Sequence, residues 1–310
     1  MTIQINSLNK RFGQTQALDN VSLRFYGQKI YGLLGNNGAG KTTLFNIITN
    51  RYFADDGDVT LDGQPIPNNE KALSQIYMQS EKNFYPEDMK VKEALYWAER
   101  FYPGFDKAFA SELVGRFQLP LKKKINALST GYETIFKIVI AFSSNAPILL
   151  LDEPVLGLDA GHRDMFYKLL ITRYSENPCT IVVSTHLIAE VAGLIEHCVI
   201  IKNGRIIKDA PCEDLLSNGY SVSGPASLVD EYLRGPGGSE SCRLPGQGQG
   251  KDVIFASNLG SLKTASVSGV APSVSERPNG LEFGKLNLQE YFIHLMNDES
   301  IGIKLQQEVQ

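Results

Sequence analysis

The chain has 310 residues, of which 43% are hydrophobic and 21% are charged, a composition typical of globular proteins rather than of disordered or fibrous chains. Its formal net charge of −4 gives no basic stripe for nucleic acid, so we expect no nucleic-acid partner. The four cysteines stand far apart without a Cys-x-x-Cys pair, which argues against a zinc site and a disulfide framework.

The beginning of the chain alternates like a β-strand and lacks the basic-then-apolar pattern of a signal peptide. Residues 1–34 alternate short apolar strands with turns, which predicts a β-rich N-terminal portion. Within it, Phe12 is a large aromatic residue in a polar setting. It either stacks on a nucleobase or closes the end of a strand.

Residues 35–43 match the phosphate-binding template of a glycine, four residues, a glycine, a lysine and a serine or threonine. Glycines at this spacing allow positive φ and let backbone N–H groups approach a polyphosphate. Lys41 is expected to contact the β- and γ-phosphates and Thr42 to bind Mg²⁺, at the start of a helix whose N-terminus attracts anions. An apolar strand before the motif and a helix after it predict the P-loop of an ATPase. The residues assigned to the nucleotide here are Gly35, Asn36, Asn37, Gly38, Ala39, Gly40, Lys41, Thr42 and Thr43.

From about residue 88 to residue 144 the apolar spacing becomes helical, which predicts a helical insertion in the nucleotide domain. A strand that ends in Gln79 precedes the insertion, and a Ser/Thr-Gly turn at residues 128–133 leads into its last helix. The most apolar stretch, residues 138–151, is broken by polar residues and is too short to cross a bilayer. We therefore expect a cytoplasmic protein without a membrane span of its own.

Continuous aliphatic residues at 148–151 predict a central parallel strand, and ligands bind outside the carboxyl ends of such strands. Asp152 and Glu153 stand at this end. Asp152 is expected to hold Mg²⁺, directly or through water, and Glu153 to orient or deprotonate the attacking water. A second apolar strand leads to His186, which is placed to reach the γ-phosphate. An Asn203-Gly204 hairpin and a short helix then close the nucleotide domain near residue 218.

Taken in order, Phe12, the P-loop, Gln79, the turn at 128–131, the acidic pair and His186 resemble the nucleotide-binding subunit of ATP-binding cassette (ABC) transporters, over about residues 1–218. The resemblance implies an α/β fold of the P-loop NTPase type, with a RecA-like core, an antiparallel β subdomain and a helical subdomain. It implies ATP and Mg²⁺ as ligands and ATP hydrolysis coupled to transport. Separate transmembrane permease subunits are the implied partners, and they would hold the chain at the cytoplasmic face of the membrane.

The resemblance also implies a role for each residue that matches the family pattern. Phe12 would stack on adenine, Gln79 would contact Mg²⁺ or water and report to the permease, and His186 would contact the γ-phosphate. Ser129 and Gly131 would act on the ATP of a second ABC subunit, because two cassettes of this family enclose two ATP molecules head to tail. Homodimer and heterodimer both remain open.

The signature segment departs from the family pattern. The usual Leu-Ser-Gly-Gly-Gln reads Leu-Ser-Thr-Gly-Tyr at residues 128–132. Either this group of transporters tolerates the change, or the site is slower or works opposite a partner with the usual signature. We favour tolerance.

Residues 219–310 change in composition and predict a small accessory α+β domain, with a flexible loop at about residues 235–250. Its last amphipathic segment, beginning at Leu288, is similar to the terminal helix of exporter-type cassettes. This domain serves either regulation and dimer contact or the packing of the cassette. For the whole chain, the leading hypothesis is a subunit that powers translocation, with export favoured. The alternative is a soluble ABC ATPase that acts on the ribosome or on nucleic acid.

Overall fold

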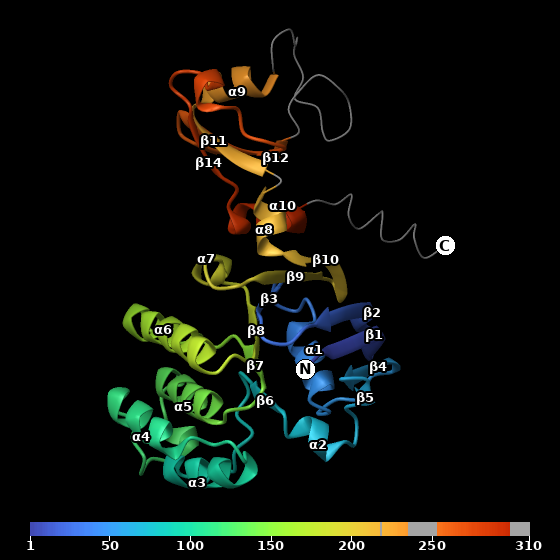
Figure 1. Cartoon of the computed structure of the whole chain (residues 1–310), viewed down its shortest axis with the longest axis vertical. Helices are drawn as coiled ribbons and strands as arrows, with labels where there is room; N and C mark the ends of the chain where they lie inside the picture. The colour runs from blue at the N-terminus through green and yellow to red at the C-terminus, as the bar shows by residue number, and fades with distance from the viewer. Residues whose placement is uncertain (218, 235–252, 298–310) are drawn as a thin grey trace. The chain divides into compact units, whose positions relative to one another are not determined.

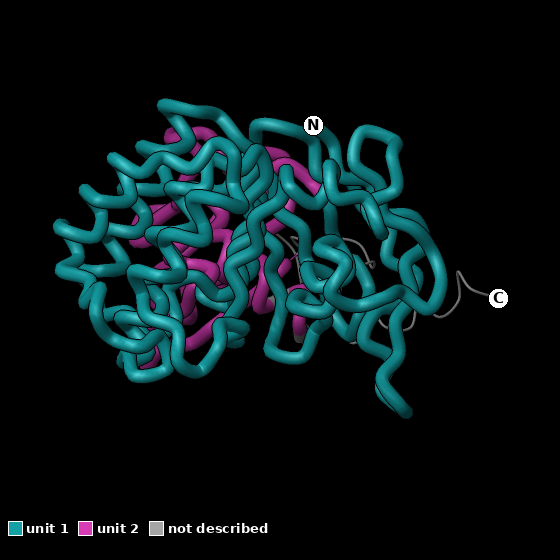
Figure 2. Tube along the Cα trace, turned by 90° about the horizontal axis from the view of Figure 1, so that it is seen from below, with its two compact units in different colours: residues 1–187, 194–209 teal, residues 188–193, 210–310 magenta. Residues whose placement is uncertain are grey.

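The computed structural model describes residues 1–217, 219–234 and 253–297. The chain forms two compact units, distinguished by colour in Figure 2. Unit 1 contains Met1–Leu187 and Leu194–Asp209, and unit 2 contains Ile188–Gly193 and Ala210–Gln310. Contacts within the chain group residues 210–217 with unit 2, and a functional domain boundary near residue 218 stays a prediction. The flexible loop expected at about 235–250 lies outside the described residues.

Unit 1 is built on a six-stranded sheet with the strand order β10-β9-β3-β8-β7-β6 (Figure 1). The neighbours from β9 to β6 run parallel. Every residue of β3, β7 and β8 is buried, as expected for parallel strands covered on both faces. The strands are β3 Ile30–Leu34, β6 Ile76–Gln79, β7 Ile148–Asp152, β8 Thr180–Thr185, β9 His197–Lys202 and β10 Arg205–Pro211.

The hairpin between β9 and β10 is confirmed. Its turn residues Asn203 and Gly204 have φ values of 51° and 77°, the left-handed pair that a two-residue turn requires.

A second sheet in unit 1, with the order β2-β1-β4-β5, is antiparallel. The buried residues of this sheet, of helix α1 and of one face of the central sheet form a single hydrophobic core. Ile5, Phe45 of α1 and Leu150 all belong to it. The P-loop helix is thereby fixed against both sheets. The elements are β1 Ile3–Phe12, β2 Thr15–Phe25, α1 Lys41–Ile48, β4 Asp56–Leu61, β5 Gln64–Pro65 and the short helix α2 Glu70–Leu73.

Helices occupy the stretch where the sequence predicts a helical insertion, and a further helix follows β7. Helix α5 begins directly after the cap residue Ser129, whose hydroxyl accepts a hydrogen bond from the Tyr132 N–H, and α6 begins after the cap residue Asp159. The elements are α3 Val91–Phe101, α4 Lys107–Arg116, the 3₁₀ turn Ile125–Ala127, α5 Thr130–Ser143 and α6 Ala160–Glu176.

Unit 2 contains a four-stranded antiparallel sheet with the order β12-β13-β11-β14. Val222 and Ala265 of the sheet share a buried core with Val229 of helix α9. The elements are α7 Ile188–Val191, α8 Cys212–Ser217, β11 Gly219–Pro225, α9 Ala226–Arg234, β12 Val253–Leu259, β13 Leu262–Ser268, the 3₁₀ turn Val274–Glu276, β14 Glu282–Lys285 and α10 Leu288–Asn297.

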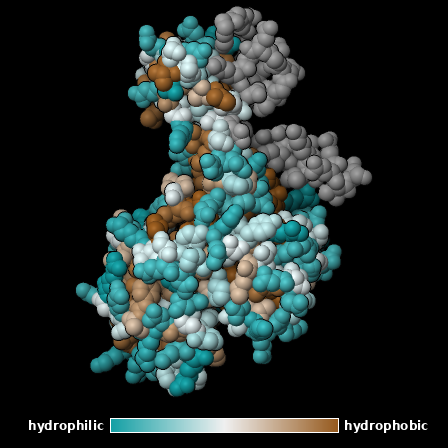
Figure 3. Space-filling model, in the orientation of Figure 1, coloured by the Kyte–Doolittle hydropathy of each residue, from teal (hydrophilic) through white to brown (hydrophobic). Residues whose placement is uncertain are grey.

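Figure 3 shows hydrophilic side chains over much of the face of unit 1 in view, with small groups of hydrophobic ones between them. Within the described ranges, none of the helices combines the length and the apolar character needed to traverse a bilayer.

Candidate active site

The loop between β3 and α1 passes so close to neighbouring backbone that an added Cβ at Gly35 or at Gly40 would lie 2.6 Å from a carbonyl oxygen. Gly40 has φ of 111°, and a Cβ there would lie 2.6 Å from the Ala17 carbonyl oxygen. Gly38 also has a positive φ, of 80°, but faces open space. The glycines of the loop therefore serve different purposes: Gly40 fits the loop against β2, whereas Gly38 leaves room in front of the loop for a ligand.

Lys41 is the first residue of α1 and is only 6% exposed. Its ammonium group donates to the Gly35 carbonyl at 2.6 Å and to the Asn36 carbonyl at 3.1 Å, and lies 3.8 Å from Glu153 Oε1. Burial lowers the pKa of Lys41, and the two carboxylates at the end of β7 act against this shift. The lysine is thus held within the curve of the loop, where a phosphate group could replace the carbonyls as its partner.

Asp152, the last residue of β7, is anchored on both carboxylate oxygens. Thr42 donates to Oδ2 at 2.7 Å and Ser184 of β8 donates to Oδ1 at 2.9 Å. The side chain is 1% exposed, and burial raises the pKa of Asp152. The structure therefore places the predicted metal-binding threonine and aspartate in direct contact.

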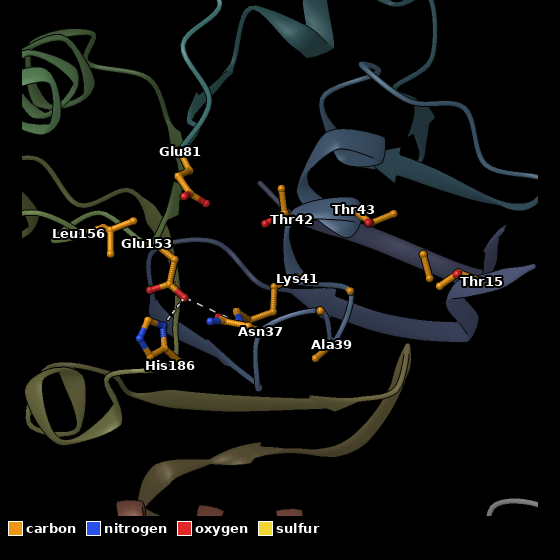
Figure 4. A pocket seen from close by; sticks show the side chains of 13 residues that line it. Thr15, Asn37, Ala39, Lys41, Thr42, Thr43, Glu81, Glu153, Leu156 and His186 are labelled. Carbon is orange, nitrogen blue, oxygen red and sulfur yellow. Dashed lines mark hydrogen bonds and ion pairs between the residues drawn. The ribbon is translucent and has the colours of Figure 1, made fainter. Parts of the chain in front are cut away.

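Glu153 follows with φ of 45°, a backbone conformation that is uncommon for a residue with a side chain. Its carboxylate accepts a hydrogen bond of 3.1 Å from the Thr185 hydroxyl and lies 2.9 Å from His186 Nδ1. Figure 4 shows Glu153 and His186 facing each other, with Lys41 opposite. Such a backbone conformation persists only where the surrounding structure holds it in place, and residues of this kind cluster at functional sites.

These residues surround a pocket of about 320 Å³. Seven residues of the P-loop, from Asn37 to Thr43, line it together with Glu153 and His186. Four residues that the sequence analysis did not single out also line it: Thr15, Ala17, Glu81 and Leu156. Gly35, Asn36 and Asp152 do not line the pocket but hold residues that do. The carbonyls of Gly35 and Asn36 accept hydrogen bonds from Lys41, and the Asp152 carboxylate accepts one from Thr42.

Gln79 is not among the residues that line this pocket. In the β6–β7 ladder Met78 pairs with Leu150 and Gln79 with Leu151. Met78 and Leu150 face the core that contains α1, so strand alternation turns Gln79 to the opposite face of the sheet. There its side chain is 3% exposed, and its Oε1 has no hydrogen-bond partner. The structure thus does not bring Gln79 to Thr42 and Asp152.

Glu81 stands two residues further on, beyond the end of β6, and its side chain lines the pocket (Figure 4). The signal for it was in the sequence, since ligands lie beyond the carboxyl ends of parallel strands rather than within them.

Phe12 is 45% exposed and also lies outside the pocket lining. Its ring meets that of Tyr52 edge-on, with 5.6 Å between centroids. Both rings line a neighbouring hollow that shares Thr42 and Thr43 with the pocket. The aromatic residue is therefore adjacent to the loop, and the Lys10 ammonium lies over its ring, 5.3 Å from the centroid.

The signature residues Ser129 and Gly131 lie outside the pocket as well. Gly131 and Thr130 pack against the segment after Glu153: a Cβ on Gly131 would lie 3.0 Å from the Gly157 carbonyl oxygen, and one on Gly157 would lie 2.7 Å from the Thr130 methyl group. The Thr130 side chain, the departure from the usual pattern, thus occupies space next to Gly157.

The oxygen donors at Thr42 and Asp152 suit Mg²⁺, which binds hard oxygen ligands and usually takes one or two carboxylates together with substrate phosphates. Among the residues that the structure describes, no group of three or more His, Cys, Asp or Glu side chains could hold a metal by itself. The residues present therefore fit an ion that a nucleotide brings with it.

The fold and this pocket define a P-loop nucleotide-binding cassette of the α/β class. Residues 18–156 match the family model described as ABC transporter. The ABC transporter ATP-binding protein YtrB of Bacillus subtilis (strain 168) is 34% identical over 190 residues, which cover 61% of this chain and 65% of YtrB. Residues 18–156 thus match the ABC transporter family, and the chain is similar over 190 residues to an ATP-binding protein of that family.

Two further comparisons extend this result. The ribose import ATP-binding protein RbsA of Bacillus subtilis (strain 168) is 28% identical over 220 residues, which cover 67% of this chain and 44% of RbsA. The solved dimeric structure of MJ0796, a bacterial ABC transporter cassette, has a TM-score of 0.60 at 24% identity and matches 68% of this chain and 98% of its own. The matched part thus has the cassette fold, and it spans less than two thirds of YtrB and of RbsA.

Proposed function

We propose that the chain binds and hydrolyses ATP and thereby powers substrate translocation through separate permease subunits. The observation that carries the proposal is that one pocket joins Lys41 of the P-loop to the hydrogen-bonded pair Glu153 and His186. A lysine at a helix N-terminus attracts phosphate, and a carboxylate next to it can take a proton from water.

In this mechanism the N–H groups of the loop and Lys41 bind the phosphates. Thr42 and Asp152 would hold Mg²⁺, which neutralises charge on the β- and γ-phosphates when bound. Glu153 accepts a proton from the attacking water, whose oxygen bonds to the γ-phosphorus as the bond to ADP breaks. His186 holds the Glu153 carboxylate in position through the contact of 2.9 Å.

A second ABC subunit is part of the proposal. Ser129 and Thr130 are exposed at the N-terminus of α5, and Ser129 and Gly131 do not line the pocket of their own chain. This placement supports their action on ATP bound to a partner cassette, as either a homodimer or a heterodimer. The solved MJ0796 cassette, which shares this fold, is itself dimeric.

A permease contact is supported by an apolar hollow of about 440 Å³ beside α3. Trp97 and Phe101 line it and are 45% and 70% exposed, with their rings stacked at 5.9 Å between centroids. Exposed aromatic clusters of this kind mark protein–protein contacts. We propose that an apolar permease segment covers them, at the cytoplasmic face of the membrane.

This contact is testable by co-purification from detergent-solubilised membranes. Trp97→Ser with Phe101→Ser should reduce recovery of the permease, whereas Val274→Ser, which alters an 80% exposed residue of unit 2, should not. Equal recovery of the permease with both variants would exclude the hollow beside α3 as its contact site. A nucleic-acid partner in place of a permease would instead support the alternative, a soluble ABC ATPase.

The nucleotide step is tested by ATP binding and phosphate release. Lys41→Ala should weaken ATP binding itself, because it removes the buried cation of the loop; equal affinity would contradict the proposed role. The sequence favours export, whereas RbsA is an import protein by name. Transport in inside-out vesicles would separate the two directions.

A further inference from the structure

We propose that Thr185 is a positioning residue for ATP hydrolysis: its hydroxyl holds one oxygen of the Glu153 carboxylate and leaves the other to accept the proton of the attacking water. The inference rests on the proposed function, in which Glu153 takes that proton. It starts from the contacts of the two carboxylate oxygens, which differ. His186 Nδ1 lies 2.9 Å from Oε1 and the Lys41 ammonium lies 3.8 Å from it, whereas the Thr185 hydroxyl lies 3.1 Å from Oε2.

The hydrogen of the Thr185 hydroxyl points toward the carboxylate. The Leu187 N–H donates to the Thr185 hydroxyl oxygen at 3.0 Å, and an ionised carboxylate accepts hydrogen bonds without donating any. The hydroxyl therefore donates its single hydrogen to Glu153 Oε2. Because N–H, hydroxyl and carboxylate form a chain, each hydrogen bond polarises and strengthens the next. Thr185 is 1% exposed and is the last residue of β8, so the sheet fixes its position.

Strand β8 also holds the backbone of Glu153. The Glu153 N–H donates to the Ser184 carbonyl oxygen at 2.9 Å, next to the uncommon φ of 45°. Two consecutive residues of β8 thus hold Glu153, Ser184 through its main chain and Thr185 through its side chain. A carboxylate held in this way is already oriented when water arrives, and orientation of the reacting groups lowers the barrier of a reaction.

The contact with Thr185 is one that a bound nucleotide would leave in place. Lys41 and His186 line the pocket, and the proposed mechanism assigns Lys41 to the phosphates, whereas Thr185 does not line the pocket. Phosphates that draw Lys41 away would free Oε1 of Glu153, while Oε2 stays bound to Thr185. Oε1 then takes one proton of the water as the water oxygen bonds to the γ-phosphorus and the bond to ADP breaks.

The test replaces the Thr185 hydroxyl by a methyl group of similar size. Thr185→Val and Thr185→Ala both remove the donor, and Thr185→Ser retains it. Thr180→Val is the matched control, because Thr180 begins the same strand, is 2% exposed and accepts a hydrogen bond of 3.2 Å from the Gln28 N–H. Phosphate release gives kcat, and isothermal titration calorimetry gives the Kd of the nonhydrolysable analogue AMP-PNP in MgCl₂. Thermal unfolding of each variant confirms that the fold is retained.

We expect Thr185→Val and Thr185→Ala to lower kcat by about 10- to 100-fold, the effect on rate of losing one hydrogen bond to a charged group, with the Kd of AMP-PNP unchanged. Thr185→Ser should recover most of the rate, and Thr180→Val should keep the wild-type kcat and Kd. In a Glu153→Gln background, Thr185→Val should cause little further loss, because the hydroxyl acts through the carboxylate.

Four results would overturn the inference and leave the proposed function intact. These are an unchanged kcat in Thr185→Val, no recovery in Thr185→Ser, an equal loss in Thr180→Val, or a Thr185→Val loss of undiminished size in the Glu153→Gln background. A wild-type protein that binds AMP-PNP but releases no phosphate from ATP would overturn both the proposed hydrolysis and the inference.

Discussion

The Thr42 hydroxyl donates a hydrogen bond of 2.7 Å to Asp152 Oδ2, which joins the first turn of α1 to the end of β7 across 110 positions of the sequence. Ser184 holds the other oxygen of the carboxylate. The position of the buried Asp152 carboxylate is therefore set by protein hydroxyls before a metal binds. This preorganisation has an energetic consequence, because a buried charge without a cation is unfavourable.

Asp152→Asn should stabilise the nucleotide-free protein at neutral pH by about 1 kcal/mol, since it removes a buried charge of the kind that costs stability. Burial raises the pKa of Asp152, so its ionisation lowers stability as pH rises through the raised pKa. Below the unfolded-state pKa the wild-type carboxyl is neutral and the gain should vanish. Urea unfolding of both proteins from acidic to neutral pH measures this difference. If Asp152→Asn raised the free energy of unfolding equally at every pH, ionisation of Asp152 would not be the cause of the gain.

Gln79→Leu should leave stability unchanged or raise it by about 1 kcal/mol, because the buried Oε1 lacks a partner and an unsatisfied polar group costs about 1–3 kcal/mol. Thermal unfolding checks this. Asn46→Leu is a suitable control, because the Asn46 amide donates to the Thr42 carbonyl at 2.7 Å and its removal should destabilise. Clear destabilisation by Gln79→Leu would show that the amide has a partner.

Gly38→Ala should lower the free energy of unfolding by about 1–3 kcal/mol, the cost of a positive φ alone. Gly40→Ala should lower it several times as much. Both glycines have positive φ, but only at Gly40 would the added Cβ meet the Ala17 carbonyl, at 2.6 Å. Gly115→Ala, in the last turn of α4 with open space around it, should instead stabilise, by up to about 1 kcal/mol. The free energy of unfolding of the three variants gives the comparison, and equal losses at Gly38 and Gly40 would exclude the contact.

The sequence predicted the elements of the cassette well because its signals are local. The P-loop, the aliphatic strand before Asp152 and the Asn203-Gly204 turn each carry their information within a few residues. Gln79 shows the limit: the residue type suggested a ligand, but which face of the sheet it occupies depends on the β6–β7 register. The place of Glu81 depends on Lys137, more than fifty residues later. Such long-range contacts have no local pattern to reveal them.

Glu153→Gln should form a dimer in the presence of Mg-ATP, because trapped nucleotide becomes part of the interface. Light scattering with and without Mg-ATP measures the mass. A dimer that requires ATP would show that the signature with Thr130 supports a self-pair. A monomer under both conditions, with ATP still bound, would contradict the homodimer and direct the search to a second cassette. Adding Ser129→Ala should weaken the dimer, whereas Ser217→Ala, on α8 of unit 2, should not.

The most direct test of the account is the rate of phosphate release by Glu153→Gln, measured beside its affinity for ATP. Glu153 lies at the pocket within hydrogen-bond distance of His186, and the proposed role is to take the proton of the attacking water. The account predicts wild-type ATP affinity and turnover lowered by about 10²- to 10⁴-fold, the range for loss of a positioned general base. Turnover equal to that of the wild type would contradict it.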